Sequence, residues 1–157
     1  MQSLPKKSSS ALVGLIVLVS IVGTGLAWAH SGASGAVKVR MDTMKDIADE
    51  MKAIATTLRN GEVREGLIGA AAQRISIKSS MVPRQFEEED LSEPTEAAPL
   101  VWEDFDRFVR LARKMEQAAG RLERAALGGA EAQIITAEFQ RLGATCSACH
   151  RDYRVRK

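Results

Sequence analysis

Apolar residues recur every three or four positions along most of this chain, which is the spacing typical of amphipathic helices. The first stripe consists of Met44, Ile47, Met51, Ile54 and Leu58. It is followed by Asn60-Gly61, a pair suited to the left-handed backbone that ends many helices. A second segment, roughly residues 62–80, repeats the spacing with Val63, Leu67, Ala71 and Ile75. We predict two consecutive helices joined by a short loop.

Two further stripes lie in the C-terminal half of the chain. Between Phe105 and Ala126 the apolar residues again step by 3 and 4, and Gly128-Gly129 then predicts a helix end. The last stripe runs from about Ala130 to Tyr153. No alternation of apolar and polar residues indicates a strand. Four amphipathic helices, with short loops after the first and third, predict an all-α fold, an antiparallel four-helix bundle.

The connection between the second and third helices is unusually long. Pro83, Pro94 and Pro99 are expected to break the helical pattern there. The acidic run "EEED" at 87–90 is interpreted as solvated charge rather than as a binding site. A loop of about twenty residues is long for a compact domain, so this segment is predicted to be either disordered or packed for a purpose.

The first 29 residues have the pattern of a secretory signal peptide. Its parts are a positive start, an uncharged stretch and a small-x-small cleavage motif, namely Lys6-Lys7, residues 11–29 and Ala27-Trp28-Ala29. Cleavage after Ala29 leaves residues 30–157 as one exported bundle domain. An uncleaved anchor is the alternative, because the uncharged run of 19 residues is close to the ~20 that span a membrane. In both cases the domain is expected in an oxidising compartment, the periplasm.

Charge excludes one class of partner. The chain has 22 Lys and Arg against 20 Asp and Glu, but Lys6 and Lys7 belong to the predicted signal. The exported part is therefore balanced and has no basic footprint for a nucleic acid. We expect no nucleic-acid partner, and membrane contact only if the N-terminal segment remains uncleaved.

Both cysteines and one of the two histidines lie in "CSACH", residues 146–150. On a helix, Cys146 and Cys149 are three residues apart and project from the same face, toward the bundle interior. His150 is four residues from Cys146 and borders that face. C-x-x-C-H is the attachment signature of c-type haem. The motif predicts one covalent haem c, held by two thioether bonds, with His150 as the proximal iron ligand.

Other uses of these residues are less well supported. A structural zinc site needs four nitrogen or sulfur ligands, and the further candidate here is the remote His30. A thioredoxin-type pair expects a βαβ context, and a disulfide leaves the adjacent histidine unexplained. His30, the expected mature N-terminus, has the groups of a weak copper chelate but is interpreted as a solvated side chain. Haem c is favoured over each of these alternatives.

The stretch "CSACHRDYR" at the end of the predicted bundle resembles the class II c-type cytochromes, the cytochrome c′ family. "RMDTMKDIADEMKAI" in the first helix and "EPTEAAPLVW" before the third match in the same order. The resemblance covers the whole exported part, and the attachment motif is its specific element. It implies that Arg40, Met41 and Glu96 contact the haem or its propionates. Tyr153 and Arg154 match as well, and are expected to be either haem neighbours or packing and surface residues.

Members of that family differ in the group that faces the iron opposite the histidine. The resemblance places Met44 there, although methionine at a stripe position is more often a core residue. A thioether opposite a histidine is a known ligand pair that raises the haem potential. We predict that Met44 binds the iron, as in low-spin members of the family, with Met41 as the second candidate. Five-coordinate iron that binds nitric oxide or carbon monoxide is the alternative.

These observations predict an exported monohaem cytochrome that carries single electrons and is not an enzyme. Redox proteins are its expected partners, and small gases take their place in the five-coordinate alternative. The resemblance also leaves a homodimer through the first two helices as an open expectation.

Overall fold

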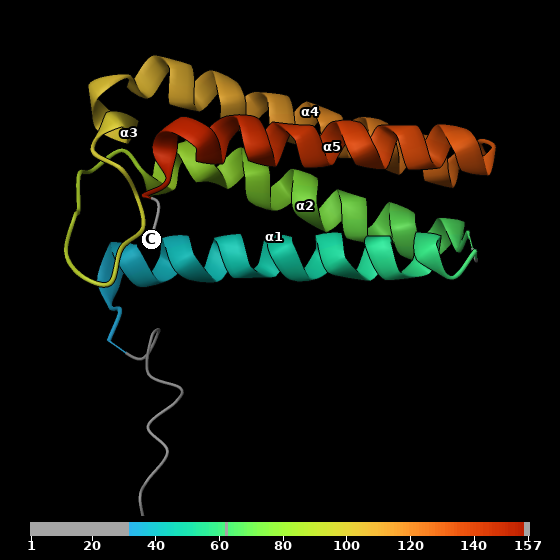
Figure 1. Cartoon of the computed structure of the whole chain (residues 1–157), viewed down its shortest axis with the longest axis horizontal. Helices are drawn as coiled ribbons and strands as arrows, with labels where there is room; N and C mark the ends of the chain where they lie inside the picture. Colours follow the sequence, from blue (N-terminus) through green and yellow to red (C-terminus); the bar gives the residue numbers. More distant parts are fainter. Residues whose placement is uncertain (1–31, 62, 156–157) are drawn as a thin grey trace, which may run out of the picture.

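The computed structural model describes residues 32–61 and 63–155. The predicted signal segment 1–29 and His30 lie outside these residues. The described part forms five helices, namely α1 (Gly35–Arg59), α2 (Glu65–Gln85), α3 (Leu100–Glu103), α4 (Phe105–Leu127) and α5 (Ala132–Tyr153). The four long helices lie side by side, each running opposite to the long helix before it, with the short α3 at one end (Figure 1). The predicted all-α, antiparallel four-helix bundle is confirmed.

The second helix is longer than predicted, and Pro83 does not break it. α2 ends at Gln85 rather than near residue 80, with Pro83 inside its last turn. A proline cannot donate the helical hydrogen bond, and its ring crowds the carbonyl four residues earlier. Because Pro83 lies in the last turn, the lost hydrogen bond and the crowding affect only the end of the helix. The amide of the buried Phe86 still donates to the Pro83 carbonyl, at 3.1 Å. The expectation that Pro83 ends the helix was therefore wrong.

Helix α3 was not predicted. Its four residues are too few for a periodic pattern to become visible. Pro99 precedes it with helical backbone angles, φ −52° and ψ −31°. Proline is favoured at the start of a helix because its fixed φ suits the first turn. Pro99 therefore begins a helix rather than only interrupting one.

The long connection 86–99 packs against the bundle, so the second of the two predicted alternatives holds. Its last part pairs with the chain at the end of α5 through an isolated antiparallel bridge between Ala97 and Arg154. The amide of Ala98 donates to the Tyr153 carbonyl at 3.0 Å, and the amide of Val155 donates to the Glu96 carbonyl at 2.9 Å. This pairing fixes the C-terminal end of α5 next to the connection.

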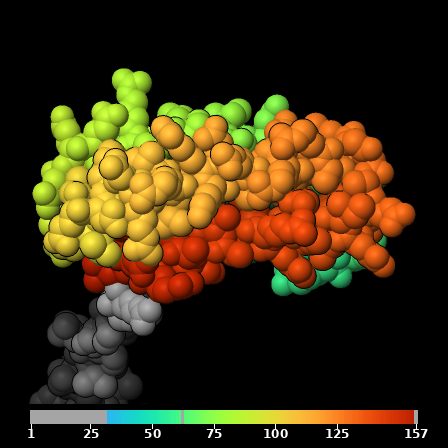
Figure 2. All heavy atoms as spheres, turned by 90° about the horizontal axis from the view of Figure 1, so that it is seen from above, coloured from blue at the N-terminus to red at the C-terminus, as the bar shows by residue number. Residues whose placement is uncertain are grey.

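Two clusters of buried side chains form the core. The larger one joins all four long helices and includes Ile54, Ile75, Leu122, Ile135 and Leu142. The smaller one lies toward α3 and consists of Val82, Phe86, Val101, Phe108, Ala112 and Tyr153. Seen from above, α4 covers one face of the bundle, with α5 along one side and α2 along the other (Figure 2). Within residues 32–61 and 63–155, no helix is long and apolar enough to cross a membrane.

Gly128, directly after α4, is predicted to resist substitution, whereas Gly69 in α2 is not. A methyl group on Gly128 would lie 2.8 Å from the backbone oxygen of Arg124, which cannot move without disturbing the helix end. On Gly69 it would lie 2.5 Å from Cδ2 of Leu127, a side chain that is 61% exposed and can rotate away. We expect Gly128→Ala to lower the free energy of unfolding by about 1 kcal/mol or more. Gly69→Ala should change it by less, because alanine also favours the helix.

Guanidinium chloride unfolding of the two purified variants measures this difference. Equal losses in both would contradict the assignment of a backbone clash to Gly128 alone.

Candidate functional site

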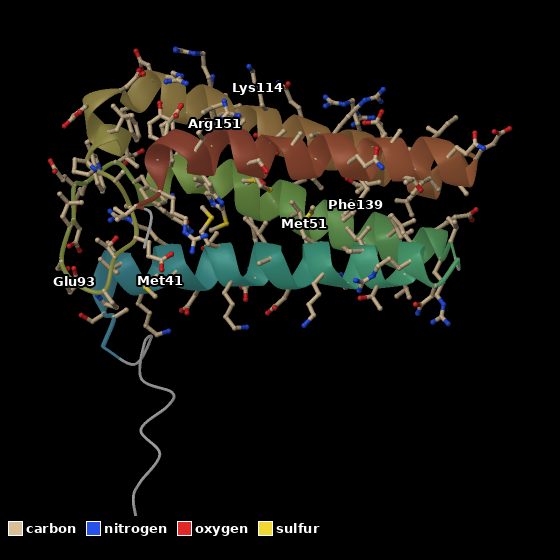
Figure 3. The ribbon with its side chains drawn as sticks, in the orientation of Figure 1. Met41, Met51, Glu93, Lys114, Phe139 and Arg151 are labelled. Carbon is tan, nitrogen blue, oxygen red and sulfur yellow. The ribbon has the colours of Figure 1, made fainter. Side chains whose placement is uncertain are left out.

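A cavity of about 600 Å³ lies where the two core clusters meet, with most of its lining from α1 and α5. Ile47 of the larger cluster and Phe108 of the smaller one both contribute to its wall. Further apolar or sulfur-containing lining side chains are Met41, Met44, Met51, Leu111, Ala112 and Met115. Figure 3 shows Met51 between α1 and the helices above it, whereas Lys114 points away from the bundle.

The wall formed by α5 carries the attachment motif. Cys146, Cys149 and His150 all line the cavity, as their spacing on one helical face predicts. Both cysteines are free, half-buried thiols. Cys149 also packs against the smaller core cluster. Among the described residues, no group of three or more His, Cys, Asp or Glu side chains is placed to hold a metal ion.

The environment of this wall shifts the ionisation of all three side chains. Burial raises the pKa of Cys146, and burial together with the neighbouring Cys146 and Asp152 raises the pKa of Cys149 to about 11. The thiols are therefore protonated at neutral pH. Partial burial and the positive charge of Arg154 lower the pKa of His150, which keeps an exposed edge, and Glu96 opposes this effect. The imidazole is thereby favoured in its neutral form, which is the form that binds a metal.

The wall formed by α1 carries methionines. Met44 is half-buried and packs against the same core cluster as Cys149, so the two side chains border one space from different helices. Met41, the second candidate, lines the cavity one turn earlier. Met51 and Met115, at apolar stripe positions of α1 and α4, are also part of the cavity wall. Their stripe positions could not separate a core residue from a cavity residue, because both face the bundle interior.

Arg40 borders the cavity but is not exposed to solvent at its surface. The side chain is 3% exposed, and its guanidinium donates to three backbone carbonyls, those of Gln85, Glu88 and Asp90. Burial lowers the pKa of Arg40 and the charges of Asp90 and Glu88 oppose this, but an arginine stays protonated in proteins. The run 87–90, interpreted as mere solvated charge, thus uses its backbone to bind Arg40. The predicted propionate contact of Arg40 stays a prediction.

Glu96 is also engaged by the protein. Its Oε2 accepts from Nε and Nη2 of Arg154 at 2.8 and 2.6 Å, and its carbonyl accepts from the amide of Val155. Glu96 and Arg154 both line the cavity. Arg154 lies four residues beyond His150 in the chain. This pair holds the connection against the end of α5, beside the histidine. A haem contact of Glu96 stays a prediction.

Sequence reasoning missed an aromatic wall at the α3 end of the cavity. The ring of Phe108 lies 5.0 Å from that of Phe86, 5.4 Å from that of Tyr153 and 6.0 Å from that of Phe105, measured between centroids. Phe86, Phe108 and Tyr153 line the cavity. The sequence did contain an indication that Phe86 is buried, because it is a single aromatic residue within the charged stretch "RQFEEED".

Residues 35–154 match the model of the family described as Cytochrome C′. The chain belongs to the cytochrome c′ family. It is 34% identical to cytochrome c-556 of Agrobacterium tumefaciens (strain II Chrys) over 125 residues, which are 79% of this chain and 100% of that protein. It is 32% identical to cytochrome c′ of Rhodospirillum rubrum over 120 residues, which are 76% of this chain and 81% of that protein.

Solved structures agree with this assignment. The crystal structure of cytochrome c′ from Thermochromatium tepidum matches with a TM-score of 0.69 and 25% identity, covering 77% of this chain and 95% of that one. The predicted membership in the class II c-type cytochromes is confirmed. The predicted cofactor, one covalent haem c, is confirmed with it. Proteins of this family are periplasmic haem proteins that carry electrons or bind gases.

The residues around the cavity fit such a group. Two thiols and an imidazole lie on one wall and a thioether lies on the other. The remaining lining is mainly apolar and aromatic, as a flat, largely apolar macrocycle requires. Arg40, Met41 and Glu96 also line this one cavity, so the structure brings together every site residue that the sequence predicted.

Phe108 is predicted to be the most costly aromatic residue to truncate at this site. It is 3% exposed and touches three other rings. We expect Phe108→Ala to lower the free energy of unfolding of the haem-loaded protein by about 3–5 kcal/mol. Phe105→Ala is the matched control, because Phe105 is only partly buried, and it should cost clearly less. Similar losses in both variants, measured by denaturant unfolding, would show that Phe108 has no special role in the wall.

Proposed function

We propose that this protein is a periplasmic monohaem electron carrier with histidine and methionine as iron ligands. Cys146 and Cys149 attach the haem, His150 is the proximal ligand and Met44 is the distal ligand. One observation carries the proposal: Met44 from α1 and the C-x-x-C-H residues from α5 line the same cavity. An imidazole and a thioether are the iron-ligand pair of such a low-spin centre, and two thiols attach the macrocycle.

The residues of the chain have distinct tasks in this proposal. The bound haem supplies a one-electron iron couple. His150 and Met44 set its potential, which a thioether ligand raises. Phe86, Phe108 and Leu111 exclude water from the cavity, and a site of low polarity needs little rearrangement when one charge is added or removed.

The proposal includes the location and assembly of the protein. Residues 30–157 form the cytochrome domain, and residues 1–29 direct its export to the periplasm. Redox proteins are the proposed partners. A homodimer through α1 and α2 is supported by four exposed apolar side chains on these helices, Val39, Leu67, Ile77 and Met81.

Gas binding by five-coordinate iron is the second candidate function. It is favoured by the 32% identity to the cytochrome c′ of Rhodospirillum rubrum, which is close to the 34% identity to a cytochrome c-556. In this version Met44 is a wall residue, and nitric oxide or carbon monoxide takes the position of its sulfur. The spectrum of the reduced protein with carbon monoxide separates the two functions, because a bound thioether must be displaced first.

The attachment residues are tested by substitution within the motif. Replacing both cysteines, Cys146→Ala and Cys149→Ala, removes both thioether bonds, so acidified organic solvent should extract the haem. Ser147→Ala, between them in the same turn of α5, should leave the haem covalently bound. Covalent haem in the double variant would contradict the assignment.

Met44→Leu tests the distal ligand. Leucine and methionine are close in volume, so stability should change by less than about 1.5 kcal/mol. The iron should become high-spin, its potential should fall and carbon monoxide should bind readily, because the sulfur ligand is lost. Visible spectra, potentiometry and carbon monoxide titration measure these changes.

Two methionines on the same helix serve as controls for this test. Met51→Leu, which alters the same cavity two turns further along α1, should leave the spectrum unchanged. Met41→Leu should do the same. A low-spin spectrum that persists in Met44→Leu and disappears in Met41→Leu would assign the sixth position to Met41 instead.

A further inference from the structure

Arg40 forms a clamp between α1 and the end of α2. Its Nε donates to the carbonyl of Gln85 at 2.8 Å, its Nη2 to that of Glu88 at 2.6 Å and its Nη1 to that of Asp90 at 3.1 Å. These carbonyls belong to the last residue of α2 and to the start of the connection. The direct contacts of the buried guanidinium are backbone carbonyls and ring faces, and the charges of Asp90 and Glu88 act on it without a direct ion pair among the described residues.

Two aromatic rings complete the clamp. The guanidinium carbon lies 4.7 Å from the centroid of Phe86 and 5.4 Å from that of Trp102, within the range of cation–π attraction. The indole Nε1 of Trp102 donates to the Phe86 carbonyl at 2.9 Å and so ties α3 to the same segment. A planar fork that donates to several carbonyls and also contacts two rings is an arrangement that arginine can satisfy and lysine cannot.

The clamp lies one turn before Met44. Arg40 and Met44 are four residues apart on α1, a rise of about 6 Å, and share a helical face. Between them, Thr43 accepts a hydrogen bond from Nε2 of Gln85 at 3.0 Å, and Ile47 is buried in the core just beyond Met44. Because α1 packs chiefly on α2, these contacts set how α1 is rotated and how near it lies to the cavity.

We infer that Arg40 is a positioning residue for Met44, holding the N-terminal half of α1 on the carbonyls of residues 85–90 so that the methionine faces the cavity. The inference rests on the proposed function, since it concerns the sulfur ligand proposed there. This positioning role differs from the predicted contact of Arg40 with a haem propionate, because it uses the bonds of the guanidinium to protein carbonyls. All groups of the clamp belong to the protein, and they join α1 to α2 rather than to the wall that carries the attachment motif.

Arg40→Lys in the haem-loaded protein is the test. Lysine keeps the charge but cannot reproduce the planar fork that donates to three carbonyls beside the two rings, so the start of α1 should loosen. We expect part of the iron to become high-spin, in a fraction that rises with temperature, and carbon monoxide to bind faster. Amide hydrogen exchange in residues 38–44 should accelerate on the order of tenfold or more, because buried charged hydrogen bonds are lost.

Arg74→Lys is the matched control. Arg74 also joins α2 to α1, through two hydrogen bonds to Glu50 at 2.6 and 2.8 Å, but it does so at the exposed surface. The same substitution there should leave spectrum, carbon monoxide binding and exchange near Met44 unchanged, because exposed ion pairs contribute little. Thr43→Val is a milder second variant, which removes the bond to Gln85 and should change the spectrum in the same direction by less.

The outcomes separate the inference from the proposed function. A high-spin fraction in Arg40→Lys and Thr43→Val, with none in Arg74→Lys, supports the inference. If Met44→Leu converts the iron to high-spin while Arg40→Lys and Thr43→Val keep the wild-type spectrum, the inference is wrong and the proposed function stands. If the wild type is already high-spin, or Met44→Leu leaves it low-spin, the proposed function fails and the inference fails with it.

Discussion

The structure depends on one packing constraint: α1 and α5 must stay apart at the α3 end of the bundle while α2 and α4 pack closely. Small buried residues, Ala72 on α2 and Ala118 and Ala119 on α4, permit the close approach on one side. On the other side, long methionines and aromatic rings border a cavity of about 600 Å³. A haem c bound in this cavity would be part of the core and would stabilise the folded bundle.

The two walls of the cavity are held in different ways. α5 packs along α4, and its C-terminal end is fixed by the pairing with residues 96–98 and by the contact between Glu96 and Arg154. α1 packs chiefly on α2, and its N-terminal half is fixed by Arg40. The wall that carries the attachment motif is thus held by helix packing and by the connection, whereas the wall that carries Met44 depends more strongly on one side chain.

The sequence predicted the bundle because its signal is local. Stripes at helical spacing predicted the four long helices, and the five residues of "CSACH" predicted the haem-attachment chemistry of one wall. The contacts of Arg40 were not predictable, since they reach 45 to 50 residues along the chain and end on backbone carbonyls. A carbonyl is present at every position, so no residue type at 85, 88 or 90 could have indicated them. The prediction that Pro83 ends the helix was wrong for a related reason. The free-energy cost of a proline depends on its position in the helix, and the sequence pattern did not show where α2 ends.

Long-range contacts of this kind also bear on how electron carriers and gas binders diverge within one fold. This chain is nearly equally similar to a cytochrome c-556 and to a cytochrome c′, so identity over the whole domain does not separate the two functions. A methionine in α1 is not sufficient for ligation either, because four methionines border the cavity and a bond to iron requires a fixed distance and direction. In the inference drawn above, the placement of α1 selects one sulfur, and contacts on the side of the helix that faces α2 set that placement. By this inference, substitutions at residues 85 and 87–90, remote in sequence from both walls, would change the function without altering any residue that lines the cavity.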